Sequence, residues 1–193
     1  MRKLVYYIGV SLDGCIAGPG GEFDFFFPVA PDMAEFQQSE YPETLPSHVR
    51  PHLGLVDVPN KRFDTVVMGR GTYQPGLDVG VTSPYAHLRQ YVVSGSLGEI
   101  ADPAVELVPS DPLGLVRRLK AEEGAADVWL CGGGVLAGQL LAEIDELVIK
   151  RYPVVAGGGL PVFAGGYAPR PFVPVEEHSF SGGGTVTTYR PAG

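Results

Sequence analysis

The sequence predicts an α/β fold built on one mixed, mainly parallel sheet with helices on both faces. Short apolar runs rich in β-branched residues alternate with helix candidates, and this alternation is typical of parallel strands covered on both sides. The end of the chain differs, because FVPVEEHSF and TVTTYR flank a Ser-Gly-Gly-Gly turn with no helix between them. This pattern predicts a closing antiparallel hairpin over residues 172–190. A length of 193 residues favours a single domain over residues 1–193.

Buried strands are expected at five apolar runs, namely 3–9, 65–68, 90–93, 127–131 and 146–155. The clearest helix spans 111–123, where Asp111 can cap, Pro112 suits the first helical position and Gly124 can end the helix. A second helix is expected from residue 133 or 134 to residue 141 or 142. The proline-rich region 42–60 lacks periodicity, so we expect a long surface excursion, either near a functional site or as a plain insertion.

Composition limits the classes of partner. The chain is 45% hydrophobic and 19% charged, with 27 glycines and 18 prolines, which indicates a globular protein with many turns. A net charge of −8 opposes general binding to nucleic acid or to an anionic membrane, so any phosphate site must be local. The apolar run near the N-terminus is too short for a secretion signal, and no segment approaches the roughly 20 apolar residues of a membrane helix. We therefore expect a cytoplasmic protein.

The cysteines and histidines predict no metal site. Cys15 and Cys131 are too far apart for a CxxC motif and lie among apolar residues, so buried free thiols are expected. The four histidines have no close pairing with cysteine or acidic residues. His48 and His52 stand four apart, but Pro51 between them weakens a helical presentation.

The segment 129–141, WLCGGGVLAGQLL, predicts a phosphate cradle. An apolar strand runs through Gly132, Gly133 and Gly134 into an amphipathic helix. Glycines allow backbone N–H groups to approach a ligand closely, and a helix start favours an anion. The alternative is a tight turn with close packing of the helix on the sheet.

Three other strands also end in small or polar residues. In VVMGRGTY at 66–73, the strand delivers Gly69, Arg70 and Thr72 to a turn whose donors suit a phosphate, although Arg70 could instead pair with a surface carboxylate. In VVSGS at 92–96, Ser94 and Ser96 suit a ribose or its phosphate, and a turn-capping role is favoured for Ser96. In SLDGCIAG at 11–18, Asp-Gly indicates a turn.

Taken in this order, the four segments resemble the dihydrofolate reductase superfamily. Within it they are most similar to the family that contains the C-terminal reductase domain of the bifunctional riboflavin-biosynthesis enzyme. DELVIKRYPVVAGGGLPVF at 145–163 extends the resemblance over nearly the whole chain. The resemblance implies a three-layer dihydrofolate-reductase-like fold. Because the match has no preceding deaminase segment or zinc motif, it looks like a stand-alone reductase-like member.

The resemblance implies an NADPH site assembled from these loops. By similarity, Ile16 and Ala17 lie at the nicotinamide, while Gly69, Arg70 and Thr72 hold phosphates. Arg70 and Ser94 are expected at the adenosine 2′-phosphate. The pyrophosphate contacts fall on the glycine run, with two apolar residues covering it: Gly132, Gly133, Gly134, Val135 and Leu136. Many members carry a basic residue directly after the serine, where this chain has Gly95, so cofactor binding is more firmly implied than a preference for NADPH over NADH.

The segment 31–36, PDMAEF, resembles the substrate-facing helix of dihydrofolate reductases. On that match Asp32 binds or protonates a pteridine-like substrate and Phe36 stacks on it, and an apolar cleft would raise the pKa of the Asp32 carboxyl. The alternative for Asp32 is a helix N-cap. The preceding phenylalanines, which are unlike the folate pattern, either wall a flat-ring pocket or fill the core: Phe23, Phe25, Phe26 and Phe27.

These observations predict an NADPH-dependent reductase that transfers hydride to a C=N or C=O bond of a small, heterocyclic substrate. The alternatives are the pyrimidinone reductase of riboflavin biosynthesis and a non-catalytic NADP-binding sensor. We also expect a homodimer, because members of this family commonly pair. The apolar segment 148–163 either supplies that surface or forms internal strand.

Overall fold

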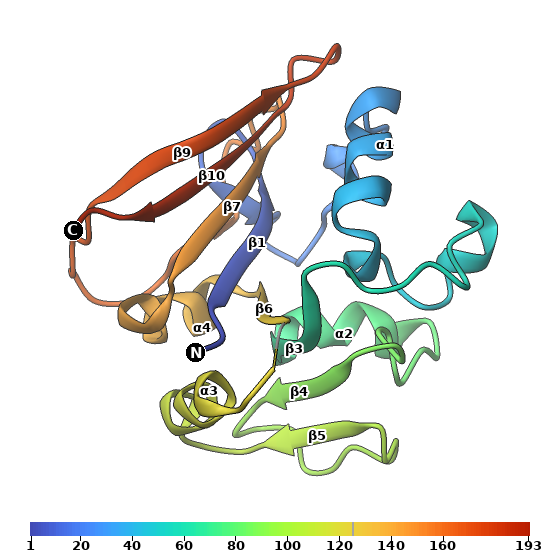
Figure 1. Cartoon of the computed structure of the whole chain (residues 1–193), viewed down its shortest axis with the longest axis vertical. Coiled ribbons are helices and arrows are strands. Elements are labelled where there is room, and N and C mark those ends of the chain that lie inside the picture. Colours follow the sequence, from blue (N-terminus) through green and yellow to red (C-terminus); the bar gives the residue numbers. More distant parts are fainter. Residues whose placement is uncertain (125) are drawn as a thin grey trace.

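The computed structural model describes residues 1–124 and 126–193, in which one large sheet runs through the molecule (Figure 1). Its strands lie in the spatial order β5-β4-β3-β6-β1-β7-β10-β9. Their bounds are β1 Leu4–Val10, β3 Phe63–Gly69, β4 Arg89–Val93, β5 Val105–Val108, β6 Asp127–Gly132, β7 Glu146–Arg151, β9 Phe172–Ser179 and β10 Thr185–Pro191.

The sheet is mixed and mainly parallel, as predicted. β1 lies at its centre and pairs in parallel with β6 on one side and β7 on the other, while β3, β4 and β5 continue the parallel part. β10 pairs antiparallel with both β7 and β9, which confirms the closing hairpin. Parallel strands end at a common edge, so the loops after β1, β3, β4 and β6 are brought together.

Helices cover both faces of the sheet, which confirms the three layers (Figure 1). α1 (Pro31–Glu40) and α2 (Arg70–Asp78) pack on one face through Met33 and Tyr73. α3 (Pro112–Ala121) and α4 (Gly134–Gln139) cover the other face with leucine-rich stripes. Two hydrophobic cores result. The core under α1 and α2 contains several aromatic side chains, including Tyr7, Tyr41, Phe63 and Trp129.

The predicted strands and the two predicted helices are present. α3 begins as predicted, because Asp111 Oδ1 accepts a hydrogen bond of 2.8 Å from Gly114 N. The strand expected over 146–155 ends at Arg151, two residues before Pro153, which cannot donate to the ladder. The last predicted helix is also shorter, since α4 ends at Gln139 and a single 3-10 turn follows over Leu141–Glu143.

The turn predicted for GRGTY is wrong, because Arg70 is the first residue of α2. The sequence RGTYQPGLD contains two glycines and a proline, which disfavour a helix on intrinsic propensity. Packing overrides that preference, since Tyr73 is 1% exposed and its hydroxyl donates to Thr82 O at 2.5 Å. β5 was also not predicted, and its short Val-Glu-Leu-Val run is an edge strand.

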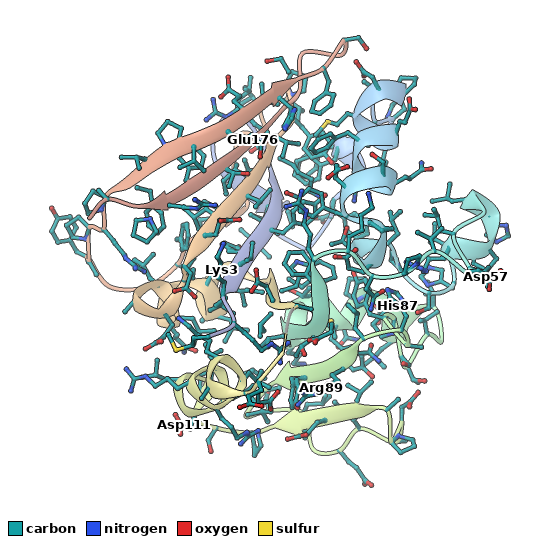
Figure 2. All side chains as sticks on the ribbon, viewed as in Figure 1. Lys3, Asp57, His87, Arg89, Asp111 and Glu176 are labelled. Atoms are coloured by element: carbon teal, nitrogen blue, oxygen red, sulfur yellow. The ribbon has the colours of Figure 1, made fainter. Side chains whose placement is uncertain are left out.

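The 42–60 excursion is more deeply built into the protein than a plain insertion. Within the two 3-10 turns Pro42–Thr44 and Arg50–Leu53, the side chains of Glu43 and Arg50 are buried. Glu43 accepts hydrogen bonds from the backbone N–H groups of residues 61, 62 and 63, and Arg50 donates to the carbonyls of Pro42 and Val58. His87, labelled in Figure 2, bonds Ser47 Oγ and the Glu43 carbonyl. Charged side chains, rather than a strand ladder, thus satisfy the hydrogen bonds of this backbone.

The apolar segment 148–163 is internal only in part, because the side chains of Val155 and Leu160 are exposed. Val148 is 1% exposed, and Val162 and Phe163 pack against the core under α3 and α4. Cys15 and Cys131 are buried free thiols, as predicted. Among the described residues, no helix is both long enough and apolar enough to cross a membrane.

Candidate active site

Three of the predicted loops meet at the carboxyl edge of the parallel strands. A Cβ placed on Gly132 would lie 3.3 Å from Thr72 Oγ1, and one placed on Gly69 would lie 3.3 Å from Gly133 N. The Ile16 side chain reaches the same point, 3.7 Å from a Cβ placed on Gly133. Gly132 has a φ of 131°, which a residue with a side chain rarely adopts. The backbone at Gly132 and Gly133 is therefore lined closely by the loops after β1 and β3.

Gly134 serves packing, which was the alternative interpretation of the glycine run. A Cβ on Gly134 would overlap the carbonyl oxygen of Pro161, and one on Gly138 would overlap that of Ala164. Ala164 N donates to Gly134 O at 2.9 Å, so the segment after β8 (Leu160–Pro161) lies directly on α4.

The two residues predicted to cover the pyrophosphate point in different directions. Val135 is 64% exposed and free to cover a ligand. Leu136 is 5% exposed and packs in the core under α3 and α4, so the covering role predicted for its side chain is wrong. The reason is helical geometry, because adjacent residues of α4 face directions about 100° apart.

Arg70 lies beside the serines that follow β4. Its Nη1 donates to Ser96 Oγ at 2.8 Å, and Ser96 Oγ is 3.5 Å from Ser94 Oγ. Ser94 is 6% exposed and accepts a hydrogen bond from Leu97 N at 3.0 Å. Ser94 is thus the turn cap, whereas Ser96, for which capping was favoured, binds Arg70. The predicted alternative of a carboxylate partner for Arg70 is wrong within the described residues.

The first loop is fixed by Asp13. Its carboxylate accepts hydrogen bonds from Ser11 Oγ at 2.6 Å, Ala156 N at 2.9 Å and Gly157 N at 2.8 Å. These bonds, with that of Ser11 the strongest, lower the pKa of Asp13 to about 2. The turn predicted at Asp-Gly is confirmed. β2 (Cys15–Ala17) then pairs with β8, and this pairing places Ile16 near Gly133 and leaves Ala17 buried.

Asp32 does not lie in the apolar cleft predicted for it. Its exposed carboxylate accepts hydrogen bonds from Ser181 N at 2.7 Å and Ser181 Oγ at 3.0 Å, and these bonds lower the pKa of Asp32. The raised pKa predicted for this carboxyl is wrong, because the hairpin turn, 149 positions away in sequence, lies against the start of α1. Nor is Asp32 the N-cap, since that position is Ala30.

Phe36 lines a surface groove of about 350 Å³ at the end of α1, with Tyr41, Arg62 and His178. None of the predicted cofactor residues lines this groove. The phenylalanine run before α1 fills the core only in part. Phe26 packs against Tyr152 with ring centroids 4.7 Å apart, whereas Phe23 and Phe27 are exposed.

Sequence reasoning missed Lys150, a charged residue in the apolar strand β7. Its Nζ lies 4.3 Å from the centroid of the Tyr7 ring, and burial lowers the pKa of the Lys150 amine to about 8. The Tyr7 hydroxyl is buried without a hydrogen-bond partner among the described residues. The sequence signal was available, because Lys150 stands two positions from each of the buried residues Val148 and Tyr152 and therefore shares their side of the extended chain.

Comparison with known proteins gives relatives over most of the chain, although no protein-family model matches it. The chain is 32% identical over 170 residues to the uncharacterized protein YwjB of Bacillus subtilis (strain 168), covering 84% of this chain and 83% of YwjB. It is 27% identical over 175 residues to the uncharacterized protein YyaP of the same organism, covering 84% and 80% of the two chains.

Solved structures extend the similarity. A Shewanella sp. PV-4 protein assigned provisionally to riboflavin biosynthesis superimposes with a TM-score of 0.71 and 27% identity, over 100% of this chain and 99% of that one. A second structure is the diaminohydroxyphosphoribosylaminopyrimidine deaminase/5-amino-6-(5-phosphoribosylamino)uracil reductase of Thermotoga maritima. It superimposes with a TM-score of 0.64 and 17% identity, over 99% of this chain and 57% of that one. Dihydrofolate reductase from Enterococcus faecalis, complexed with NADP(H), superimposes with a TM-score of 0.63 and 15% identity, over 99% of this chain and 97% of that one. The last two similarities show a shared fold.

Proposed function

The chain belongs to the dihydrofolate reductase superfamily, in the family of the riboflavin-pathway reductase domain, and we propose that it is an NADPH-dependent reductase. In this proposal hydride passes to a C=N or C=O bond of a small, heterocyclic substrate. The reductases among the solved neighbours support the general class of reaction. The choice of NADPH depends on the loops at the carboxyl edge of the sheet.

The observation that carries the proposal is the cluster of Arg70, Ser96 and Ser94 beside the glycine backbone. A guanidinium hydrogen-bonded to a hydroxyl, with no carboxylate partner among the described residues, presents several donors that fit a phosphate monoester. In a chain of net charge −8, such a cationic site must be local. Gly69, Gly132 and Gly133 let the loops after β3 and β6 approach each other closely, and their backbone N–H groups would hold a second phosphate.

The residues at this edge fit NADPH, whose nicotinamide supplies the hydride when bound. Arg70, Ser94 and Ser96 would hold the adenosine 2′-phosphate, and Thr72 with the backbone of 132–134 would hold the pyrophosphate. Ile16 and Ala17 would position the nicotinamide, since Ile16 packs near Gly133. Val135, being exposed, would exclude water from the phosphates.

The proposal is tested first by cofactor binding. NADPH should raise the melting temperature of the wild-type protein, and Arg70→Ala should weaken NADPH binding by roughly 10- to 100-fold, the value of a charge-assisted hydrogen bond. NADH binding should change little. Arg118→Ala is the control, because Arg118 is exposed on α3 and its ion pair with Glu106, at 3.9 Å, is long. An equal loss for NADPH and NADH in Arg70→Ala would contradict the assignment of the 2′-phosphate.

Turnover is tested by NADPH oxidation with a panel of planar ketones, aldehydes and imines. The panel includes a ribosylaminopyrimidinone phosphate, because the Shewanella relative supports the riboflavin-pathway alternative. Reduction of that compound alone would favour the pyrimidinone reductase. The second alternative is a non-catalytic NADP-binding sensor. The lowered pKa of Asp32 favours it unless another residue donates the proton, because Asp32 is ionised at neutral pH. Cofactor binding without oxidation across the panel would support the sensor.

A further inference from the structure

Lys150 is a titratable side chain under α1 that takes no part in the proposed cofactor site. It lies on β7 opposite Gly9 of β1 and opposite Val186 of β10. Its ammonium group is partly buried over the Tyr7 ring, and no ion pair of Lys150 is found among the described residues. Removing a cation from water without an anionic partner is unfavourable, and such groups cluster at functional sites.

The position of Lys150 connects it to the cofactor loops. It shares a face of the sheet with Cys131, whose thiol it influences electrostatically, and Cys131 immediately precedes Gly132. Gly9 has no side chain. A Cβ at this position would lie 3.0 Å from the Tyr152 ring and 4.0 Å from Lys150 Cε, so glycine leaves Lys150 and Tyr152 unseparated. Phe26 packs on the other side of Tyr152. An amine and flat aromatic rings therefore meet near the end of β1.

Other titratable groups near Lys150 do not compete for the role. Burial raises the pKa of Tyr152 and of Cys131 to about 12, and raises that of Tyr7 well above its usual range, so all three stay neutral at pH 7. α1 presents Met33 to the sheet, while Asp32 and Glu35 on that helix are exposed. The charge of the buried Glu43 also acts on Tyr7, but its carboxylate is held by the backbone N–H groups of residues 61–63. Among the described residues, Lys150 is consequently the charged group paired with Gly9 on this face.

We propose that the Lys150 ammonium binds and protonates the acceptor atom of the substrate, a flat-ring compound with a C=O or C=N group. This inference rests on the proposed function. Hydride forms a new C–H bond at the acceptor carbon, the π-electron pair moves to the oxygen or nitrogen, and that atom takes a proton from Lys150 Nζ. NADPH is oxidised, the substrate is reduced, and solvent returns the proton to Lys150. A pKa of about 8 suits a proton donor at neutral pH.

Labelling with pyridoxal tests the site without turnover. Pyridoxal is a flat-ring aldehyde without a phosphate, and its carbonyl condenses with a neutral amine to an imine and water; borohydride then reduces the imine to a stable secondary amine. At pH 8 about half of the Lys150 amine would be neutral, against a small fraction of ordinary lysines. Peptide mass spectrometry should find Lys150 labelled before the exposed Lys3 and Lys61. An unlabelled Lys150 would overturn the proposal.

Variants test the proton transfer. With the fastest compound of the panel, Lys150→Met should lower kcat/KM at pH 7 by roughly 100-fold or more, the usual contribution of a general acid. Wild-type kcat/KM should fall above pH 8, where Lys150 loses its proton. Lys150→Arg should have a KM close to that of wild type, but its kcat should stay low and its kcat/KM should not fall above pH 8. Lys3→Met is the matched control at the opposite end of β1. A wild-type rate in Lys150→Met would overturn the proposal.

The two proposals fail differently. NADPH should still raise the melting temperature of Lys150→Met, because the phosphate-binding loops are intact. If the wild-type protein reduces no compound of the panel, the proposed function fails, and the pyridoxal result decides separately whether Lys150 is a carbonyl-binding amine. If turnover occurs and is unaffected by Lys150→Met, the proposed function stands and the role of Lys150 is overturned.

Discussion

The loop cluster after β1, β3, β4 and β6 differs in construction from the side-chain layer under α1. In the loop cluster, backbone groups and small side chains come within van der Waals contact because glycine stands at 69, 132 and 134. Under α1, large aromatic rings such as Tyr7 fill the space together with the buried Glu43 and the partly buried Lys150. Phosphates are common to all dinucleotides and suit backbone recognition, whereas side chains determine which acceptor fits.

The largest loss of stability is expected at Glu43, in the side-chain layer. Glu43→Ala would leave three backbone N–H groups of residues 61–63 without their carboxylate acceptor. We expect a destabilisation of about 3 kcal/mol or more, which lowers Tm by roughly 6–12 °C in a protein of this length. Chemical denaturation monitored by circular dichroism measures it. Glu35→Ala, an exposed substitution on α1, should change stability by less than about 0.5 kcal/mol. A small effect of Glu43→Ala would show that buried side-chain charge does not hold this layer together.

An intermediate loss is expected at Gly134, in the loop cluster. Alanine usually stabilises a helix relative to glycine by about 0.5–1 kcal/mol, but a Cβ at 134 would overlap the Pro161 carbonyl. Gly134→Ala should therefore destabilise by about 1–3 kcal/mol and weaken NADPH binding as α4 shifts. Gly71→Ala is the control for stability, because a Cβ there meets no atom within 4 Å and position 71 lies in α2. Thermal melts of both variants check the opposite signs, and stabilisation by Gly134→Ala would refute the packing role.

The smallest effect is expected from Asp32→Asn, which tests whether Asp32 holds the hairpin turn or takes part in turnover. Asparagine can still accept one hydrogen bond from Ser181, so turnover should stay within about threefold of wild type and Tm at pH 7 should fall slightly. Because the pKa of Asp32 is lowered in the folded protein, its stabilising contribution is present above the unfolded pKa of about 3.9 and is lost as pH falls below it. The Tm difference between the two proteins should thus shrink in acid. A large loss of turnover would restore Asp32 as the proton donor.

Much of the loop cluster at the carboxyl edge was predictable, because its signals are local. Apolar runs ending in glycine, serine or threonine mark strands that stop at a loop, and the parallel topology places those loops at one edge. The pairing of Arg70 with Ser96 was not predictable, since it depends on how the start of α2 is oriented by Tyr73. The surroundings of Asp32 and Phe36 were predicted poorly, because both residues were assigned by resemblance to a short helix motif. In the structure Asp32 accepts hydrogen bonds from Ser181, and the Phe36 ring packs against His178. Both partners belong to the C-terminal hairpin, which is far away in sequence.

The sequence by itself determined most strands of the large sheet, the helices α3 and α4, the hairpin, the cap of α3 and the small residues after several strands, because periodicity, turn chemistry and capping act over a few residues. Only the tertiary structure decided that RGTYQPGLD is helical, that Gly134 contacts Pro161, that Asp32 holds a distant turn and that Lys150 lies over Tyr7. These features depend on contacts between segments far apart in the chain, and burial in those contacts sets both backbone conformation and side-chain pKa.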